Sequence, residues 1–211
     1  KNPNAELKAW NYTYWSLKQR KEFYDFDGNE IKPYFSVQKV LDGLFKIAEN
    51  NFKIKICQRK TYVHSEGDNN EHKDEIEVYN NDVMYFEVYD IQTEKKIGGI
   101  YADLYPRENK LDGAWAELLN YGDIEKGKPT IVILGTNVNK PIGDKPALLS
   151  HYNVREIFHE FGHCLHYMFY NGKIKGLSTM NVPMDFLELP SMFFEKFAWE
   201  RQALDLFAEH Y

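Results

Sequence analysis

His159-Glu160-Phe161-Gly162-His163 is the stretch of this 211-residue chain that most constrains its fold. Residues four apart on a helix share a face, so a helix here places both imidazoles on one side, roughly 5–6 Å apart at Cβ. Two neutral imidazoles at that spacing can bind one zinc ion. Glu160 projects about 100° round the helix from His159, close enough to take a proton from a water on the metal. The pattern favours hydrolysis of an amide, with an amphipathic helix carrying two polar histidines as the alternative.

A catalytic zinc site needs a third protein ligand and one open position. Glu188 is the best candidate, because it follows His163 far enough on for one helix to end, a loop to turn back and a second helix to begin. Asn171-Gly172 is a plausible end for the first helix. We expect Asp185 to cap the second helix, with Pro190 near its start and Glu188 facing the metal from its first turn.

Four other polar residues near these helices are weaker candidates. Glu195 lies at nearly the same azimuth as Glu188 and is the second choice for the third ligand. We expect it instead to hydrogen-bond a ligating histidine, as metal-bound imidazoles usually require, and Asp185 could serve the same purpose. His166 is expected to line the pocket or support a ligand rather than to bind metal. Glu156 is expected to be solvated or to orient a neighbour.

Residues 159–166 (His-Glu-Phe-Gly-His-Cys-Leu-His) and 185–191 (Asp-Phe-Leu-Glu-Leu-Pro-Ser) resemble the thimet oligopeptidase and peptidyl-dipeptidase family of zinc metallopeptidases. Residues 99–115 resemble the same family. The residues that follow the histidine motif are most similar to the peptidyl-dipeptidase branch. The chain departs from the family at Met192, where Gln is common, and at Ser178-Thr179-Met180, where Ser-Gly-Thr is common. Neither departure falls on a ligand, although both can alter the pocket or the loop.

The resemblance implies that His159, His163 and Glu188 hold one zinc ion per chain and that Glu160 is the catalytic base. It also implies a fold of the α+β class, a predominantly α-helical zincin-type metallopeptidase core with a small β-sheet. The implied function is zinc-dependent hydrolysis of peptide bonds in short peptides, either as an oligopeptidase or as a peptidyl-dipeptidase.

The family's proteins are considerably longer than this chain, with a helical region before it and a Gly- and Tyr-rich segment after it. That later segment supplies donors to the substrate carbonyl and the oxyanion, and loss of one such donor typically costs about 10²–10³ in rate. We therefore expect residues 1–211 to be a fragment whose partners are short peptides and the remaining N- and C-terminal parts of a longer peptidase. The alternative is an incomplete or inactive zinc-binding fragment that binds peptide or a partner chain without turnover.

Composition excludes several classes of protein. Apolar residues make up 43% of the chain and aromatic residues 16%, which is typical of a folded domain rather than a disordered one. The net charge of −6 argues against a nucleic-acid partner, and the absence of a long apolar run argues against a membrane span. Cys57 and Cys164 offer no disulfide framework, and no signal peptide precedes the fold, so a reducing, cytoplasmic location is expected.

Periodicity divides the chain into three regions. Helices are expected over 5–50, in two segments at 5–26 and 37–49, and the aromatic stripe of the first is expected to be core. A small β subdomain is expected over 52–136, with strands at 52–56, 84–89, 97–104 and 130–134. Metal-site helices are expected over 150–211, at 150–170 and 184–211.

Two further expectations concern the β subdomain. Asp103 and Arg107 are expected to form a structural ion pair rather than to catalyse. In zincins, a strand beside the metal helix commonly pairs with the extended substrate backbone. By resemblance, residues 130–137 are expected to provide that strand, which requires a free edge.

Overall fold

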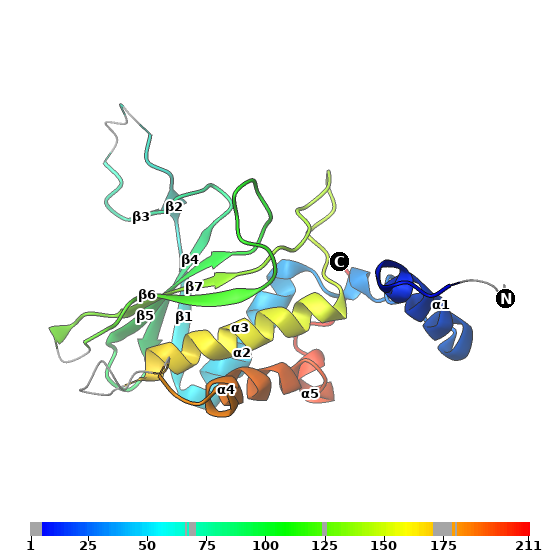
Figure 1. Ribbon diagram of the computed structural model, residues 1–211. Coiled ribbons are helices and arrows are strands. Elements are labelled where there is room, and N and C mark those ends of the chain that lie inside the picture. The colour runs from blue at the N-terminus through cyan, green and yellow to red at the C-terminus, as the bar shows by residue number, and fades with distance from the viewer. Residues whose placement is uncertain (1–5, 66, 68–70, 124–125, 171–178, 180) are drawn as a thin grey trace.

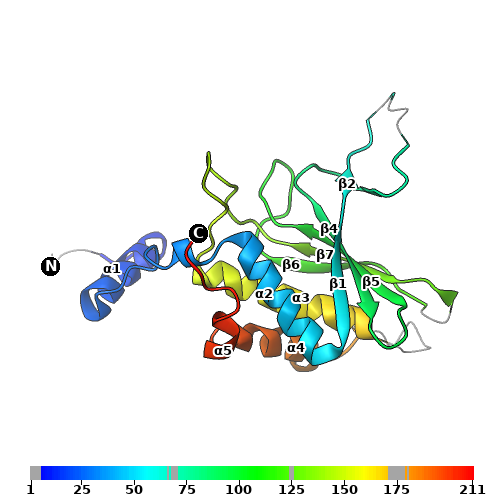
Figure 2. The same cartoon turned by 180° about the vertical axis from the view of Figure 1, so that it is seen from behind.

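The computed structural model describes residues 6–65, 67, 71–123, 126–170, 179 and 181–211. A five-stranded sheet forms one layer, and the helices α2 (Val37–Phe52) and α3 (His151–Phe169) lie along one of its faces (Figures 1 and 2). Helix α4 (Met184–Phe197) packs against α3, and the short α5 (Arg201–Leu204) follows it. The chain is therefore an α+β structure. Within the described ranges, every helix is too short or too polar to span a lipid bilayer.

The sheet has the strand order β1-β4-β5-β7-β6. Neighbouring strands are antiparallel except β5 and β7, which run parallel. The five strands are β1 (Ile54–Arg59), β4 (Met84–Asp90), β5 (Lys96–Asp103), β6 (Trp115–Asn120) and β7 (Thr130–Gly135). Two short strands, β2 (Thr61–Tyr62) and β3 (Ile76–Glu77), pair with each other outside this sheet.

Most of the strands and helices expected from periodicity are present, with small shifts at their ends. Phe52 belongs to α2 rather than to the first strand, which begins at Ile54. Strand β6 was not expected at all. Its sequence, Trp-Ala-Glu-Leu-Leu-Asn, contains good helix formers, and only its antiparallel pairing with β7 makes it a strand. The sheet is consequently larger than the sequence predicted.

The prediction that residues 130–134 form a free edge strand is wrong. Strand β7 lies between β5 and β6, and both neighbours are hydrogen-bonded to it. Its nearly continuous apolar run, Thr-Ile-Val-Ile-Leu, is typical of a central strand, because such a strand is covered on both faces. The edge of the sheet on this side is β6.

The core lies between the helices and the inner face of the sheet. Val40 and Leu44 of α2 and Val132 of β7 have no exposed surface, and Phe45 packs its ring edge-on against Phe86 of β4. Ser36, the residue before α2, has the extended backbone conformation of an N-cap, but its side chain makes no capping hydrogen bond. Both cysteines are unpaired, one of them buried in α3.

The prediction that the aromatic residues of the first helix are core is wrong. Helix α1 (Tyr12–Tyr24) follows a short 3₁₀ turn at Ala9–Asn11, and none of its residues is buried. It extends away from the sheet and the other helices (Figure 1). The positions that suggested a stripe are exposed, and so are other apolar side chains of the helix. The first set is Leu7, Trp10, Tyr14 and Leu17, and the second includes Tyr12, Trp15, Phe23 and Tyr24. Nothing in the described part of the chain buries them.

The prediction of one helix over 184–211 is also wrong, because α4 ends at Phe197. The carbonyl oxygen of Ala198 accepts a hydrogen bond from the ring Nε2 of His151, 2.8 Å away on α3. The chain then turns so that Phe207 packs against Phe158 in the core. A contact with α3 therefore ends the helix, which periodicity along α4 could not reveal.

A charged cluster lies on the outer face of the sheet. Glu87 alternates with the core residues Phe86 and Val88, so its side chain points away from the helices. Its buried carboxylate accepts hydrogen bonds from Arg59 at 2.7 Å and Lys96 at 2.6 Å, and from the hydroxyl of Tyr89. Burial raises the pKa of this carboxyl, but the three donors outweigh it and lower the pKa to about 2.

We expect Glu87→Gln to lower the free energy of unfolding at pH 7 by about 1–3 kcal/mol. Because the folded-state pKa lies below the ordinary value of 4.5, ionised Glu87 stabilises the fold above that pH, and the contribution is lost as the pH falls toward 2. Urea unfolding at a series of pH values measures the effect, which should shrink toward acid.

Asp205→Asn is the control for this substitution, because Asp205 pairs with Arg201 in an exposed i,i+4 contact. Such pairs contribute about 0.5 kcal/mol or less. Coincident unfolding curves for wild type and Glu87→Gln at pH 7 would contradict the stabilising role of the cluster.

Candidate metal centre

Helices α3 and α4 approach each other closely at Gly162. A Cβ added to Gly162 would lie 2.7 Å from the carbonyl oxygen of Pro190 and 2.7 Å from the Cα of Ser191. Both are backbone atoms, so the position has room for hydrogen only. Glycine inside a helix costs about 1 kcal/mol relative to alanine, and this close backbone approach explains its presence here. The contact brings the two motif histidines of α3 opposite Glu188 of α4.

The structure brings together the three predicted zinc ligands. One ligand atom from each of His159, His163 and Glu188 lies within 4.8 Å of the others. Carboxylate Oε2 of Glu188 is 3.2 Å from Nε2 of His159 and 3.2 Å from Nε2 of His163. The ring centroids of the histidines are 5.0 Å apart, as the spacing of four residues predicts.

Helix α4 carries Glu188 differently from the prediction. The helix begins at Met184 after an N-cap at Pro183, so Asp185 is a residue of the first turn and not the cap. Glu188 therefore lies in the second turn, and Pro190 is inside the helix. The predicted helix end at Asn171-Gly172 lies outside the described residues, and α3 ends at Phe169.

Three side chains orient these donors. The hydroxyl of Ser191 donates to Oε2 of Glu188 at 2.8 Å, although it also reaches the Glu188 carbonyl. Glu195 places Oε2 3.4 Å from Nδ1 of His159, the contact with a ligating histidine that the sequence suggested. Arg155 in turn holds Glu195, with its Nε 2.8 Å from Oε1.

Sequence reasoning missed Ser191 and Arg155. Both follow a simple spacing signal, because Arg155 precedes His159 by one helical turn and Ser191 follows Glu188 by three residues. The pKa of Glu195 reflects this environment. Partial burial raises it, but the hydrogen bond and charge of Arg155, together with His159, lower it overall.

Glu160 is buried beside the three donors. Burial raises the pKa of its carboxyl to about 7, and the charges of Glu188 and Glu156 act in the same direction. A carboxyl with a pKa near neutrality can both accept and release a proton at pH 7. A cation held at Glu188 would lower this pKa again, toward the ionised form that a base requires.

The remaining site candidates are placed as follows. Burial lowers the pKa of His163, which favours the neutral, ligand-competent imidazole, and it lowers the pKa of His166 in the same way. Nδ1 of His166 is buried without a hydrogen-bond partner among the described residues, and its ring lies 6.2 Å from that of Phe186. Asp185 is exposed and accepts the backbone N–H of Phe186. Glu156 accepts a hydrogen bond from Asn153 at 3.0 Å.

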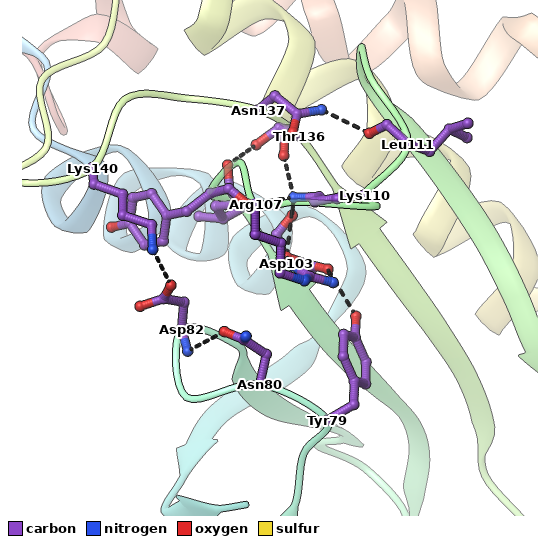
Figure 3. A network of polar contacts seen from close by, with 12 residues as sticks. Tyr79, Asn80, Asp82, Asp103, Arg107, Lys110, Leu111, Thr136, Asn137 and Lys140 are labelled. Carbon is purple, nitrogen blue, oxygen red and sulfur yellow. Dashed lines mark hydrogen bonds and ion pairs between the residues drawn. The ribbon is translucent and has the colours of Figure 1, made fainter.

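A second polar network lies where β5 and β7 end (Figure 3). Asp103 is buried, and its two carboxylate oxygens accept hydrogen bonds from Arg107 at 2.7 and 2.8 Å, so the predicted ion pair is confirmed. Lys110 lies 3.0 Å from the same carboxylate and donates to the carbonyl oxygens of Asp103, Tyr105 and Thr136. These contacts fix the loop that leads into β6, which is a structural role.

The histidine pair, the opposed carboxylate and the buried Glu160 form the arrangement that a metallopeptidase requires. Residues 1–211 match peptidase family M3 in full, and the chain belongs to this family. Comparison with known proteins thus confirms the family that the two motifs predicted.

Three relatives illustrate the family. The chain is 36% identical over 211 residues to oligopeptidase A of Escherichia coli K12, covering 98% of this chain and 29% of that protein. It is 33% identical over 206 residues to dipeptidyl carboxypeptidase of the same organism, covering 97% and 28%. It is 28% identical over 222 residues to saccharolysin of Saccharomyces cerevisiae, covering 100% and 29%. The chain thus spans less than a third of the length of these curated relatives.

We expect Gly162→Ala to destabilise the fold by about 1–3 kcal/mol, because the added methyl group would push the backbone of α4 away. In an unobstructed helix the same change would stabilise by about 0.5–1 kcal/mol. Urea unfolding decides the sign. Gly28→Ala is the control, since a Cβ there meets nothing within 4 Å. A stabilised Gly162→Ala variant would contradict the tight crossing.

Proposed function

We propose that the protein hydrolyses peptide bonds in short peptides with the help of a zinc ion bound by His159, His163 and Glu188. The observation that carries this proposal is the convergence of three donor atoms within 4.8 Å, beside a buried glutamate. We further propose that the fold is of the zincin type and that residues 1–211 form its zinc-binding core. The organisation into helices over 5–50, a β subdomain over 52–136 and metal-site helices over 150–211 belongs to this proposal.

The chemistry of the donors fits zinc. Two imidazole nitrogens and one carboxylate oxygen form the ligand set of many catalytic zinc sites, with one position left for water or substrate. His163 is favoured in its neutral form by burial, as a ligand must be. Glu188 is held by Ser191 through the same oxygen that faces both imidazoles. When bound, zinc lowers the pKa of water toward neutrality and polarises carbonyl oxygens.

Glu160 is the proposed general base and acid. Its carboxylate would accept a proton from the attacking water and pass that proton to the leaving amine. Its burial next to the donors keeps bulk water from competing for the proton. A site that only binds metal has no use for a carboxyl group in this position.

We propose that substrate binds as an extended strand along β6. This strand is at the end of the sheet order and contacts α3, the helix that carries the histidines. Extended peptides commonly add to a free sheet edge, where main-chain hydrogen bonds give affinity. The Asp103 network supports this assignment, because it fixes the loop that enters β6.

The similarity to an oligopeptidase and to a dipeptidyl carboxypeptidase supports short peptides as the substrate class. Because the chain spans only 29% of oligopeptidase A, we propose that other segments of a longer protein complete the substrate and oxyanion contacts. The same fact favours a second candidate, in which the 211-residue chain binds zinc or peptide without turnover.

Zinc binding is the first test. We expect the chain to bind one zinc ion and Glu188→Ala to weaken binding about 100-fold or more, because loss of a direct ligand exceeds the effect of an outer partner. Competition with a chromophoric chelator measures the dissociation constant. Glu200→Ala is the control, since Glu200 lies in the turn beyond α4. Equal zinc affinity in wild type and Glu188→Ala would contradict the ligand assignment.

Glu160→Gln separates binding from chemistry. We expect this variant to keep zinc but to lose hydrolysis by about 10²–10⁴, since the amide cannot accept the proton. Mass spectrometry of a short unstructured peptide, incubated with the chain and zinc, provides the readout. An equally active Glu160→Gln variant would contradict the base assignment. A zinc-loaded wild type that cleaves nothing would favour the second candidate.

A further inference from the structure

A chain of contacts links Arg155 to the metal centre through Glu195. Nε and Nη2 of Arg155 both donate to Oε1 of Glu195, the first at 2.8 Å. The other oxygen, Oε2, is 3.4 Å from Nδ1 of His159. Nε2 of the same imidazole faces Glu188 at 3.2 Å. Arg155 and the histidine are on α3, whereas both glutamates are on α4, so the contacts cross the helix interface three times.

Arg155 is itself held in place. Its guanidinium lies over the ring of Trp199, 5.6 Å from the centroid. Trp199 packs edge-on against His151 at 4.3 Å, and His151 is hydrogen-bonded to the carbonyl of Ala198. Arg155 and Trp199 both line an open pocket of about 630 Å³ that residues of α1 also border. Its side chain remains 36% exposed, so a substitution there is tolerable for packing.

We propose that Arg155 is a positioning residue for the metal centre, fixing the Glu195 carboxylate so that this carboxylate orients the ring of His159. The inference rests on the proposed ligand role of His159. At 3.4 Å the contact with His159 alone holds Glu195 only weakly. Two charge-assisted donors on one oxygen hold it far better and leave the second oxygen for the imidazole. With Glu195 fixed, Nδ1 carries the ring proton and Nε2 presents its lone pair to the metal.

Two effects of Arg155 on a bound cation oppose each other. Its positive charge repels the cation, whereas its hold on Glu195 aligns a ligand. Solvent screens the direct charge effect, because the guanidinium is about one-third exposed and is paired with a carboxylate. The alignment acts through a hydrogen bond of 2.8 Å to Glu195, which screening weakens less than a charge that acts over a longer distance. Arg155 therefore increases metal affinity overall.

A double-mutant cycle on the full chain tests the coupling, with zinc affinity measured by chelator competition. Loss of a residue that directly contacts a ligating histidine typically costs about 10–100-fold in affinity. Arg155 is one contact further away, so we expect Arg155→Met to weaken zinc binding about threefold to tenfold. Arg155→Lys should recover part of the loss, since lysine keeps the charge but not the fork of donors. In a Glu195→Gln background Arg155→Met should have no further effect.

A spectroscopic readout separates positioning from folding. The ¹⁵N chemical shifts of the His159 ring report its tautomer, and we expect one tautomer in wild type and a mixture in Arg155→Met. Arg201→Met is the matched control, because Arg201 of α5 makes an exposed contact with Asp205, the residue that follows the helix. It should alter neither the shifts nor the affinity.

The outcomes that overturn the inference are distinct from those that overturn the proposed function. Unchanged or tighter zinc binding in Arg155→Met would refute it, and so would an equal loss with and without Glu195. A wild-type chain that binds no zinc would instead refute the ligand role of His159.

Discussion

The backbone contact between Gly162 of α3 and Pro190 of α4 determines how the candidate metal ligands are brought together. One helix can place two donors at adjacent turns, but a third donor has to come from another element, at a distance set by packing. Helices normally pack 8–10 Å apart, with the spacing set by the side chains between them. A glycine at the crossing lets the second helix come close enough for Glu188 to reach both imidazoles. The cost of about 1 kcal/mol in helix propensity is part of building the site.

The sheet provides the rigid support for α3, and its charged groups are satisfied separately from the metal centre. Glu87 and Asp103 are each buried, and each is paired with two cationic side chains and a tyrosine hydroxyl. A buried carboxylate that loses its partners destabilises a fold by several kcal/mol, so such groups require complete networks. The network at Asp103 also joins the ends of β5 and β7 to the loop before β6. The position of β6 relative to α3 is therefore fixed both by its pairing with β7 and by the loop that precedes it.

Local spacing was enough to predict the histidine pair and Glu160, because their relative positions depend only on helix geometry. Strand order was not predictable in this way. The run at 130–134 identifies a strand, but whether it lies at an edge depends on β6, whose sequence favours a helix. Whether helix α1 is buried was not predictable either, because an apolar stripe indicates burial only when another element covers it. The places where prediction failed are those decided by contacts distant in sequence.

Arg155 shows why the surroundings of a metal centre are harder to read from sequence than its ligands. Its position one turn before His159 suggests a direct neighbour, yet its contact runs through Glu195 on another helix. The packing of α3 on α4 and the alignment of the donors therefore depend on each other. A cation bound by both helices would stabilise their packing, and their packing lowers the ordering cost of binding the cation. Burial raises the pKa of Glu160, and the charges of Glu188 and Glu156 raise it further, because neighbouring carboxylates resist ionisation together. A divalent cation held at Glu188 would relieve that repulsion, and its binding would then be coupled to proton release from Glu160. The carboxylates that disfavour one another in ionised form are therefore the ones whose repulsion a bound cation would relieve.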